Sequence, residues 1–231
     1  MSNMMSVKYL YHSGVSVSYK NRILIFDYFK KGFESKELDS YEEVFIFVSH
    51  RHKDHFDNEI LKWNQLHENI HYIFSSDISQ KFSLKNITFM GPDEKRTVND
   101  LFISTYRSTD EGVAFLVETE SGNIFHSGDL NWWHWEEDDE KNNQLMKMKF
   151  IEEISKLKNM KIDIAFIPVD QRLSYAKYYA IDYLMENVSV RKVFPIHLFD
   201  DYSFLTTAEK DLSDRAYYDK ISFYKEGQNE V

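Results

Sequence analysis

The chain of 231 residues contains no cysteine. Disulfide bonds and thiolate metal ligands are therefore excluded, and any metal ion must be held by histidine, aspartate or glutamate. Long apolar runs are also missing, since no stretch approaches the roughly 20 residues that a membrane helix needs. Residues 1–6 contain no basic segment followed by an apolar core, which is the pattern of a secretory signal. We therefore expect a cytoplasmic protein without a membrane partner.

Positive charge is scarce. The chain has 28 Lys and Arg against 38 Asp and Glu, which gives a net charge of −10. Its densest basic stretches, such as that from Lys156 to Lys158, are typical of solvated helix or loop faces. An acidic chain can bind nucleic acid only through a local basic patch, although bound metal ions also attract phosphate. We expect a small-molecule substrate rather than a nucleic-acid partner.

The residues that are present favour a folded protein. The chain is 42% hydrophobic and 16% aromatic, which argues against a disordered polypeptide. Its length suffices for a substantial core, and it shows neither repeats nor a linker, so we predict a single domain over residues 1–231. The apolar patterns predict strands that include residues 22–26, 44–48, 70–75, 162–169, 193–197 and a closing strand at 221–224.

The densest group of metal-ligating residue types directly follows the apolar run 44–48. His50, His52, Asp54 and His55 stand within six residues, in the pattern HxHxDH. A buried strand would fix this loop and let its side chains project past the strand end. His50 and His52 can then hold one ion, whereas Asp54 and His55 can face a second. Imidazole and carboxylate ligands suit zinc, and also iron, nickel or manganese.

The HxHxDH pattern is the signature of the metallo-β-lactamase superfamily, which the chain resembles along nearly its whole length. It looks closest to the branch with the UlaG-like lactonases and uncharacterised bacterial metal-dependent hydrolases. The resemblance implies an α/β fold of the α+β kind, a four-layer αββα sandwich with helices flanking two mixed β-sheets. It also implies that Asp27 supports the metal loop by hydrogen bonding without binding metal. His12 resembles a histidine near the start of UlaG-like chains; a place beside the site and a structural role both stay open.

One position departs from the family pattern. Relatives usually place a histidine, the third ligand of the first metal, in the loop that corresponds to residues 108–112. This sequence has no histidine between His71 and His126. Asp110 is the expected substitute, because a carboxylate can complete a set of two histidines and one aspartate. Glu111 is the alternative, and a loop without a ligand is another. A carboxylate here would shift the metal preference somewhat from zinc toward manganese or iron.

The remaining family motifs follow in the expected order. The resemblance implies that Asp129 bridges two metal ions and that His197 completes the second site with Asp54 and His55. Three tryptophans come soon after Asp129, and large aromatic residues often wall small-molecule pockets. His134 lies among them, either as a proton donor or substrate contact or as a structural residue of an aromatic cluster.

Three other residues are assigned open roles near the site. His126 stands just before the Gly-Asp pair and could support the metal ligands from behind. Asp170 and Arg172 belong to a Pro-x-Asp-x-Arg segment that resembles one in UlaG-like proteins, and they could shape the pocket. For Arg172, contact with a substrate anion and a structural ion pair both remain open.

The resemblance implies an enzyme in which two divalent ions, with zinc as the first expectation, activate a hydroxide. The hydroxide would attack a small ester, lactone, amide or phosphoester, and Asp54 or His134 would carry the proton. A phosphodiesterase or nuclease is the first alternative. The second is a metal-binding or sensing protein with impaired hydrolysis, because the usual third histidine is missing. Members of the superfamily are often oligomers, so a homo-oligomer is also expected.

Overall fold

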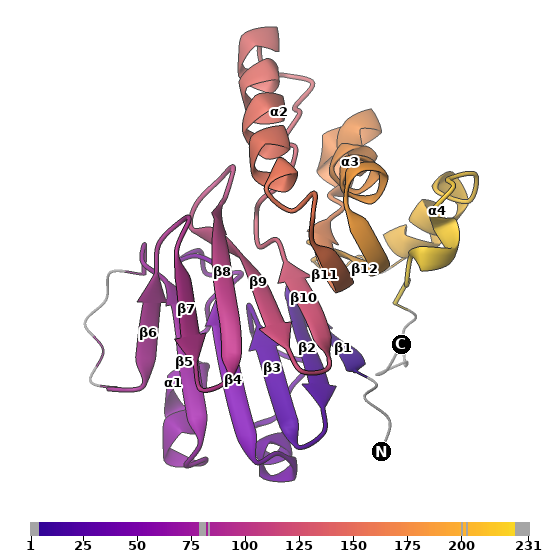
Figure 1. Cartoon of the computed structure of the whole chain (residues 1–231). Coiled ribbons are helices and arrows are strands. Elements are labelled where there is room, and N and C mark those ends of the chain that lie inside the picture. The colour runs from indigo at the N-terminus through magenta and orange to yellow at the C-terminus, as the bar shows by residue number, and fades with distance from the viewer. Residues whose placement is uncertain (1–4, 79–81, 83, 200, 202, 225–231) are drawn as a thin grey trace.

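The computed structural model describes residues 5–224 except 79–81, 83, 200 and 202. Within these residues, two six-stranded sheets form the centre of the protein (Figure 1). The first sheet contains, in spatial order, β1 (Ser6–Tyr11), β2 (Gly14–Tyr19), β3 (Arg22–Phe26), β4 (Glu43–Val48), β5 (Ile70–Ser75) and β6 (Ile87–Met90). The second contains β12 (Ser189–Ile196), β11 (Lys161–Pro168), β10 (Gly122–His126), β9 (Val113–Thr119), β8 (Leu101–Arg107) and β7 (Lys95–Val98).

Both sheets are mixed. In the first sheet, β1 to β3 pair antiparallel and β3 to β6 pair parallel. In the second, β10, β11 and β12 pair parallel, while β7 to β10 pair antiparallel. The two mixed sheets with flanking helices confirm the predicted αββα sandwich.

The helices divide between the two sheets (Figure 1). On the first sheet lie η1 (Ser35–Ser40), α1 (Glu59–Lys62) and η2 (Trp63–Gln65), and with the second lie α2 (Glu140–Ser155), η3 (Gln171–Tyr178), α3 (Tyr179–Asn187), α4 (Phe204–Asp211) and η4 (Tyr218–Lys220). Asp139 caps the N-terminus of α2, because its side chain accepts a hydrogen bond from the Asn142 amide. In the described part of the chain, no helix combines the length and apolar character needed to cross a membrane.

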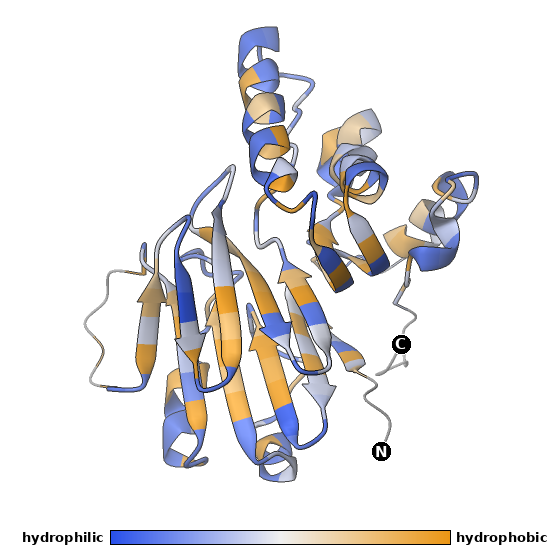
Figure 2. Ribbon diagram, viewed as in Figure 1, coloured by the Kyte–Doolittle hydropathy of each residue, from blue (hydrophilic) through white to orange (hydrophobic). Residues whose placement is uncertain are grey.

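Burial on both faces explains the apolar run of β4. Phe45 and Phe47 point into the core between the sheets, whereas Ile46 belongs to a second cluster that includes Ile60 and Trp63 of the α1–η2 segment. A strand covered on both sides loses the alternation of polar and apolar residues, and it appears as a continuous apolar stripe in Figure 2. Each such side chain contributes about 1.5–3 kcal/mol through burial. The strand that precedes the metal loop is therefore anchored from both sides.

One predicted element is not a strand. Residues 221–224 do not form the closing strand that their apolar pattern suggested. Instead Ile221 forms an isolated bridge with Val193, and the Ser222 amide donates to the Val193 carbonyl at 2.9 Å. This single β-bridge connects the segment to β12, and the side chains of Phe223 and Tyr224 pack against the core.

The strand ends bring distant segments together around the HxHxDH loop. The loop after β8, residues 108–112, packs directly against it, because the Val113 amide donates to the Ser49 carbonyl at 2.9 Å. Gly112 makes this close approach possible. It has φ +71°, and a Cβ atom there would stand 2.0 Å from the Ser49 carbonyl oxygen and 2.5 Å from Cβ of His50.

We expect Gly112→Ala to lower the free energy of unfolding by roughly 2 kcal/mol or more, because both the positive φ and the backbone clash strain the variant. Gly91→Ala is the matched control. Its Cβ would meet only side-chain atoms of Glu94 and Ser76 at 3.3 Å, and its φ is not positive. Urea denaturation of both variants measures the difference. An equal loss in the two would contradict the tight packing of the two loops.

Candidate metal centre

A buried carboxylate fastens the HxHxDH loop to the first sheet. Asp27 follows β3, and its side chain accepts hydrogen bonds from the amide of Ser49 at 2.7 Å and from the Ser49 hydroxyl at 2.6 Å. Farther along the loop, Nδ1 of His55 lies 2.8 Å from Oδ2 of Asp27. Burial raises the pKa of Asp27, but the neighbouring His55 more than offsets this and holds the pKa below its usual value. Asp27 thus supports the loop as the resemblance implied.

Asp129 lies at the centre of the histidines. It follows β10 and Gly128, is buried, and directs its two oxygens to different rings. Oδ1 is 3.2 Å from Nε2 of His55 and 3.5 Å from Nε2 of His197, whereas Oδ2 is 3.5 Å from Nε2 of His50. Burial raises the pKa of Asp129, but the neighbouring His55 more than offsets this and keeps the pKa well below its usual value. This carboxylate stays ionised at neutral pH.

The first predicted site gathers around His50 and His52. Nε2 of His50 is 3.0 Å from Nδ1 of His52, and Oδ2 of Asp110 is 3.9 Å from the same Nδ1. Glu111 instead makes a two-pronged ion pair with Arg51, at 2.7 Å for both contacts, although it also lies 3.5 Å from Nε2 of His52. Burial and the charge of Asp129 raise the pKa of Asp110. Among the residues that the structure describes, Glu111 pairs with an arginine, whereas Asp110 has no Lys or Arg partner.

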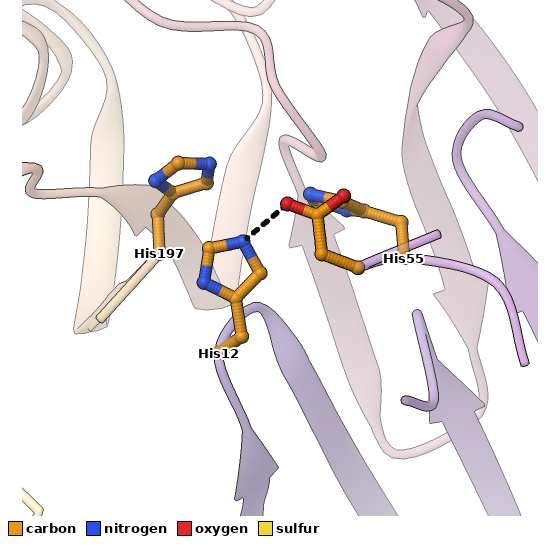
Figure 3. A group of neighbouring side chains, drawn as sticks. His12, His55 and His197 are labelled. Atoms are coloured by element: carbon orange, nitrogen blue, oxygen red, sulfur yellow. Dashed lines mark ion pairs between the residues drawn. The ribbon is translucent and has the colours of Figure 1, made fainter. Parts of the chain in front are cut away.

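The second predicted site contains Asp54, His55 and His197, and the structure adds His12. One ligand atom from each of these four residues lies within 4.8 Å of the others. Figure 3 shows the imidazoles of His12, His55 and His197 converging from three parts of the chain, and its dashed line marks the contact between His12 and Asp54. Nε2 of His12 is 3.3 Å from Oδ2 of Asp54. The sequence left the place of His12 open, and the structure puts it at the centre.

His12 is held so that its Nε2 faces Asp54. The Phe199 amide donates a hydrogen bond to Nδ1 of His12 at 3.2 Å, so Nδ1 is an acceptor and the neutral ring carries its hydrogen on Nε2. Burial lowers the pKa of His12 to about 4, so the ring is neutral at pH 7. The contact lowers the pKa of Asp54 below its usual value. In this tautomer the hydrogen on Nε2 faces Asp54 at 3.3 Å, and ligation by His12 would require that hydrogen to leave Nε2.

The donor set fits divalent metal ions. Nitrogen and carboxylate oxygen atoms are the ligands that zinc, iron and manganese take in proteins. Two of these atoms, Nε2 of His55 and Oδ1 of Asp129, are buried and face each other at 3.2 Å without the geometry of a hydrogen bond. A cation between ligands of these two kinds would be coordinated by both. The residues present can therefore hold the metals that the resemblance implied.

Two histidines that the sequence singled out, His126 and His134, lie outside the groups of candidate metal ligands. His126 is buried, and both of its nitrogens are engaged: Nε2 is 3.0 Å from the Ser13 carbonyl oxygen, and Nδ1 accepts from the Gly128 amide at 3.1 Å. It braces the turn before Asp129. His134 points to the surface, where Nε2 is 2.8 Å from the Tyr175 hydroxyl. The structure does not bring His134 to the metal cluster.

A cavity of about 360 Å³ opens beside the cluster. Candidate metal ligands form one wall of this cavity, and aromatic and apolar side chains form another. Arg172 also lines the cavity. The lining residues are His52, Asp54, Thr109, Asp110, Asp129, Trp133, Trp135, Asp138, Met146, Arg172 and Phe199. A larger hollow of about 510 Å³ lies on the other side of the 108–112 loop, and Asp110 is the one ligand candidate that it touches. The smaller cavity is therefore the one placed for chemistry at the cluster.

Comparisons with known proteins agree with this geometry. Residues 6–197 match the family described as "Beta-lactamase superfamily domain". A metal-dependent hydrolase of Nanoarchaeum equitans is 27% identical, over 89% of this chain and 93% of its own. The structure of a metallo hydrolase from Ignicoccus hospitalis has a TM-score of 0.71 at 14% identity, covering 98% of this chain and 97% of that one. A structure from Parabacteroides distasonis, described as a "Putative metal-dependent hydrolase", has a TM-score of 0.65 at 16% identity, covering 91% of this chain and 89% of that one.

The two structures are too distant in sequence to show more than the shared fold. The family match is different in kind, because it spans well over half of the chain and contains the HxHxDH loop, Asp129 and His197. The chain therefore belongs to the metallo-β-lactamase superfamily.

Proposed function

We propose that the protein hydrolyses a small ester, lactone, amide or phosphoester at a centre of two divalent metal ions, with zinc first and manganese, iron or nickel as the other candidates. One observation carries the proposal: the two oxygens of the buried Asp129 face different histidines. A carboxylate placed in this way can join two ions and offset their mutual repulsion. The first ion would be held by His50, His52 and Asp110, and the second by Asp54, His55 and His197.

Oxygen atoms behind the rings prepare three histidines for this role. Nδ1 of His55 faces Asp27 at 2.8 Å, Nδ1 of His197 faces Oδ2 of Asp170 at 2.9 Å, and Nδ1 of His50 lies 3.0 Å from the Ser49 hydroxyl. An acceptor at Nδ1 favours a hydrogen there and leaves the Nε2 lone pair for a metal. All three Nε2 atoms face Asp129, so the chain fixes ring orientation and tautomer together.

When bound, the metals would supply Lewis acidity and lower the pKa of a water molecule toward neutrality. The protein contributes ligand positions, a partly enclosed cavity and charge. Asp54 suits ligation better than proton transfer, because contact with His12 lowers its pKa and a general base works best with a pKa near the operating pH. The proton-carrying role predicted for His134 gains no support from its contact with Tyr175.

The alternatives have less support. A nuclease needs a basic surface for the phosphate backbone, but carboxylates outnumber cations in the cavity and the chain carries a net charge of −10. A metal-binding protein with impaired hydrolysis would follow if the 108–112 loop supplied no ligand. The position of Asp110 near His52 argues against it.

Metal content tests the centre directly. We expect two metal ions per chain in the wild type and one in Asp110→Ala, because the first site then loses a ligand. Glu111→Ala is the matched control: this neighbouring carboxylate is paired with Arg51, so both ions should remain. Elemental mass spectrometry after growth with added zinc, manganese or iron gives the counts. One ion or none in the wild type would overturn the two-metal proposal.

Activity tests the reaction class. The loaded wild type should turn over at least one of an aryl ester, a γ-lactone, an anilide or bis(4-nitrophenyl) phosphate, and a chelator should abolish the reaction. We expect Asp129→Asn to reduce the rate at least ~100-fold, because the amide cannot offset the charge of two ions. Unchanged rates in that variant would rule out hydrolysis at this centre.

Metal binding should release a proton from His55. Burial lowers the pKa of His55, but the charges of Asp129 and Asp27 more than compensate and raise it well above its usual value. The ring is therefore protonated at pH 7 without metal, and a metal at Nε2 must displace that proton. Burial lowers the pKa of His50 to about 4, so His50 is already neutral and releases none.

We expect roughly one proton per chain from His55 when the second ion binds at pH 7, and fewer in Asp27→Asn, whose lost charge lets the pKa of His55 fall. Calorimetry in buffers of different ionisation enthalpy measures the number. The same release from both proteins would show that Asp27 does not control this ring.

His12 should control the affinity of the second ion without binding it. We expect His12→Phe to lower the affinity of the protein for the second ion by about 10–100-fold, since Asp54 loses its orienting donor. His12→Gln should weaken it less, because an amide can still donate. Competition with a chromophoric chelator reports the two ions separately. If both variants bind only one ion at saturating metal, His12 is a ligand and the assignment of its hydrogen is wrong.

A further inference from the structure

Among the residues that the structure describes, Arg172 is the one Lys or Arg whose side chain lines the cavity beside the metal cluster. Its guanidinium lies against two aromatic rings, 5.6 Å from the centroid of Trp135 and 5.2 Å from that of Phe199. On its other edge, Nε is 2.9 Å from Oδ1 of Asp170, and Nη2 contacts Oδ2. Aromatic faces and a two-pronged carboxylate together fix the plane of the group. Arg172 is therefore preorganised rather than mobile.

The ion pair with Asp170 does not exhaust the hydrogen-bond donors of Arg172. A guanidinium has five N–H donors, and Asp170 takes one from Nε and one from Nη2. The remaining three, including both on Nη1, have no acceptor among the residues that the structure describes. The side chain is also 51% exposed, although Asp170 is buried beneath it. Asp170 thus holds the group from below and leaves its outer edge open.

The acidic residues of the cavity do not compete for that edge. Asp54, Asp110 and Asp129 belong to the proposed ligand set, where bound cations would offset their charges. Asp138 accepts hydrogen bonds from the Asp139 amide and the Asn142 side chain at the start of α2, the end of a helix that favours negative charge. With the metals present, the open N–H donors of Arg172 are the hydrogen-bond donors of a cationic group that an entering anion meets in this cavity.

We propose that Arg172 binds an oxyanion on the substrate, so that the cavity selects a small molecule with an apolar or aromatic body and one negatively charged group. This inference rests on the proposed hydrolysis at the same centre. Trp133 and Trp135 stack with centroids 5.9 Å apart, and with Phe199 they provide the apolar wall for the body of the molecule. The anionic group then fixes which end faces the metals.

Three probes with one body and different charges test the proposal. They are 3-phenylpropanoate, its neutral amide 3-phenylpropanamide, and the cation 3-phenylpropylamine, titrated by calorimetry into the metal-loaded protein. A charge-assisted hydrogen bond contributes enough for roughly a 10- to 100-fold preference, so the carboxylate should bind most tightly by about that factor. The measurement needs no turnover, so failure to hydrolyse any substrate would count against the proposed function alone.

Variants assign the preference to Arg172. In Arg172→Met the preference for carboxylate over amide should fall to near one, and in Arg172→Lys part of it should remain. Arg215→Met is the matched control, since Arg215 pairs with both oxygens of Asp182 in a similar geometry, at 2.8 Å and 3.3 Å, outside this cavity. Its preference should equal that of the wild type. Metal content is measured for each preparation, because Asp170 also contacts His197.

Three results would overturn the proposal. A full preference for the carboxylate in Arg172→Met would mean that the anion binds the metals directly. Tightest binding of the amine would mean that the acidic residues set the charge of the cavity. An equal loss of carboxylate and amide binding in Arg172→Met would show that Arg172 only supports the shape of the wall.

A phosphonate of the same body, added as a fourth probe, distinguishes a carboxylate site from a phosphate site by its relative affinity.

Discussion

The metal centre depends on one buried carboxylate, Asp27, which reaches from the end of β3 to the loop after β4. Parallel strands align these two ends, but alignment alone does not fix a loop. Three contacts to Asp27 do: the amide and hydroxyl of Ser49 at the loop start and the His55 ring farther on. An ionised side chain in a dry interior is costly unless it is fully bonded. The same interactions that satisfy Asp27 therefore dictate where His50 and His55 point.

The second constraint is that each sheet contributes half of the centre. The HxHxDH loop comes from the first sheet, whereas Asp129 and His197 follow β10 and β12 of the second. Contacts between the inner faces fix the position of one sheet relative to the other; the rings of Phe47 and Phe115, for example, have their centroids 5.3 Å apart. Packing in the core thus sets distances at the site, because a shift of one sheet would move Asp129 away from His55. Stability and chemistry depend on the same interface.

The sequence predicted those parts of the centre that are local. Spacing singled out the four residues of the HxHxDH loop, and motif order singled out Asp129 and His197, because each follows an apolar strand. The structure brings these side chains together, and their role as ligands stays a prediction. Contacts between distant residues could not be found in this way. The sequence alone does not show that Asp54 contacts His12. Nor does it show that Arg51 pairs with Glu111 and not with Asp110. Nearness in sequence also does not fix nearness in space, since His134 is close to Asp129 in sequence but turns to Tyr175.

Asp170 connects metal binding to substrate recognition. One of its oxygens faces Nδ1 of His197, and both hold the guanidinium of Arg172. The charge on Asp170 is thereby shared between a proposed metal ligand and the proposed anion-binding group. Because Asp170 fixes both groups, the position of the proposed ligand and that of the proposed anion-binding group depend on the same buried carboxylate. The cavity and the centre are then one binding unit, linked through a single buried side chain.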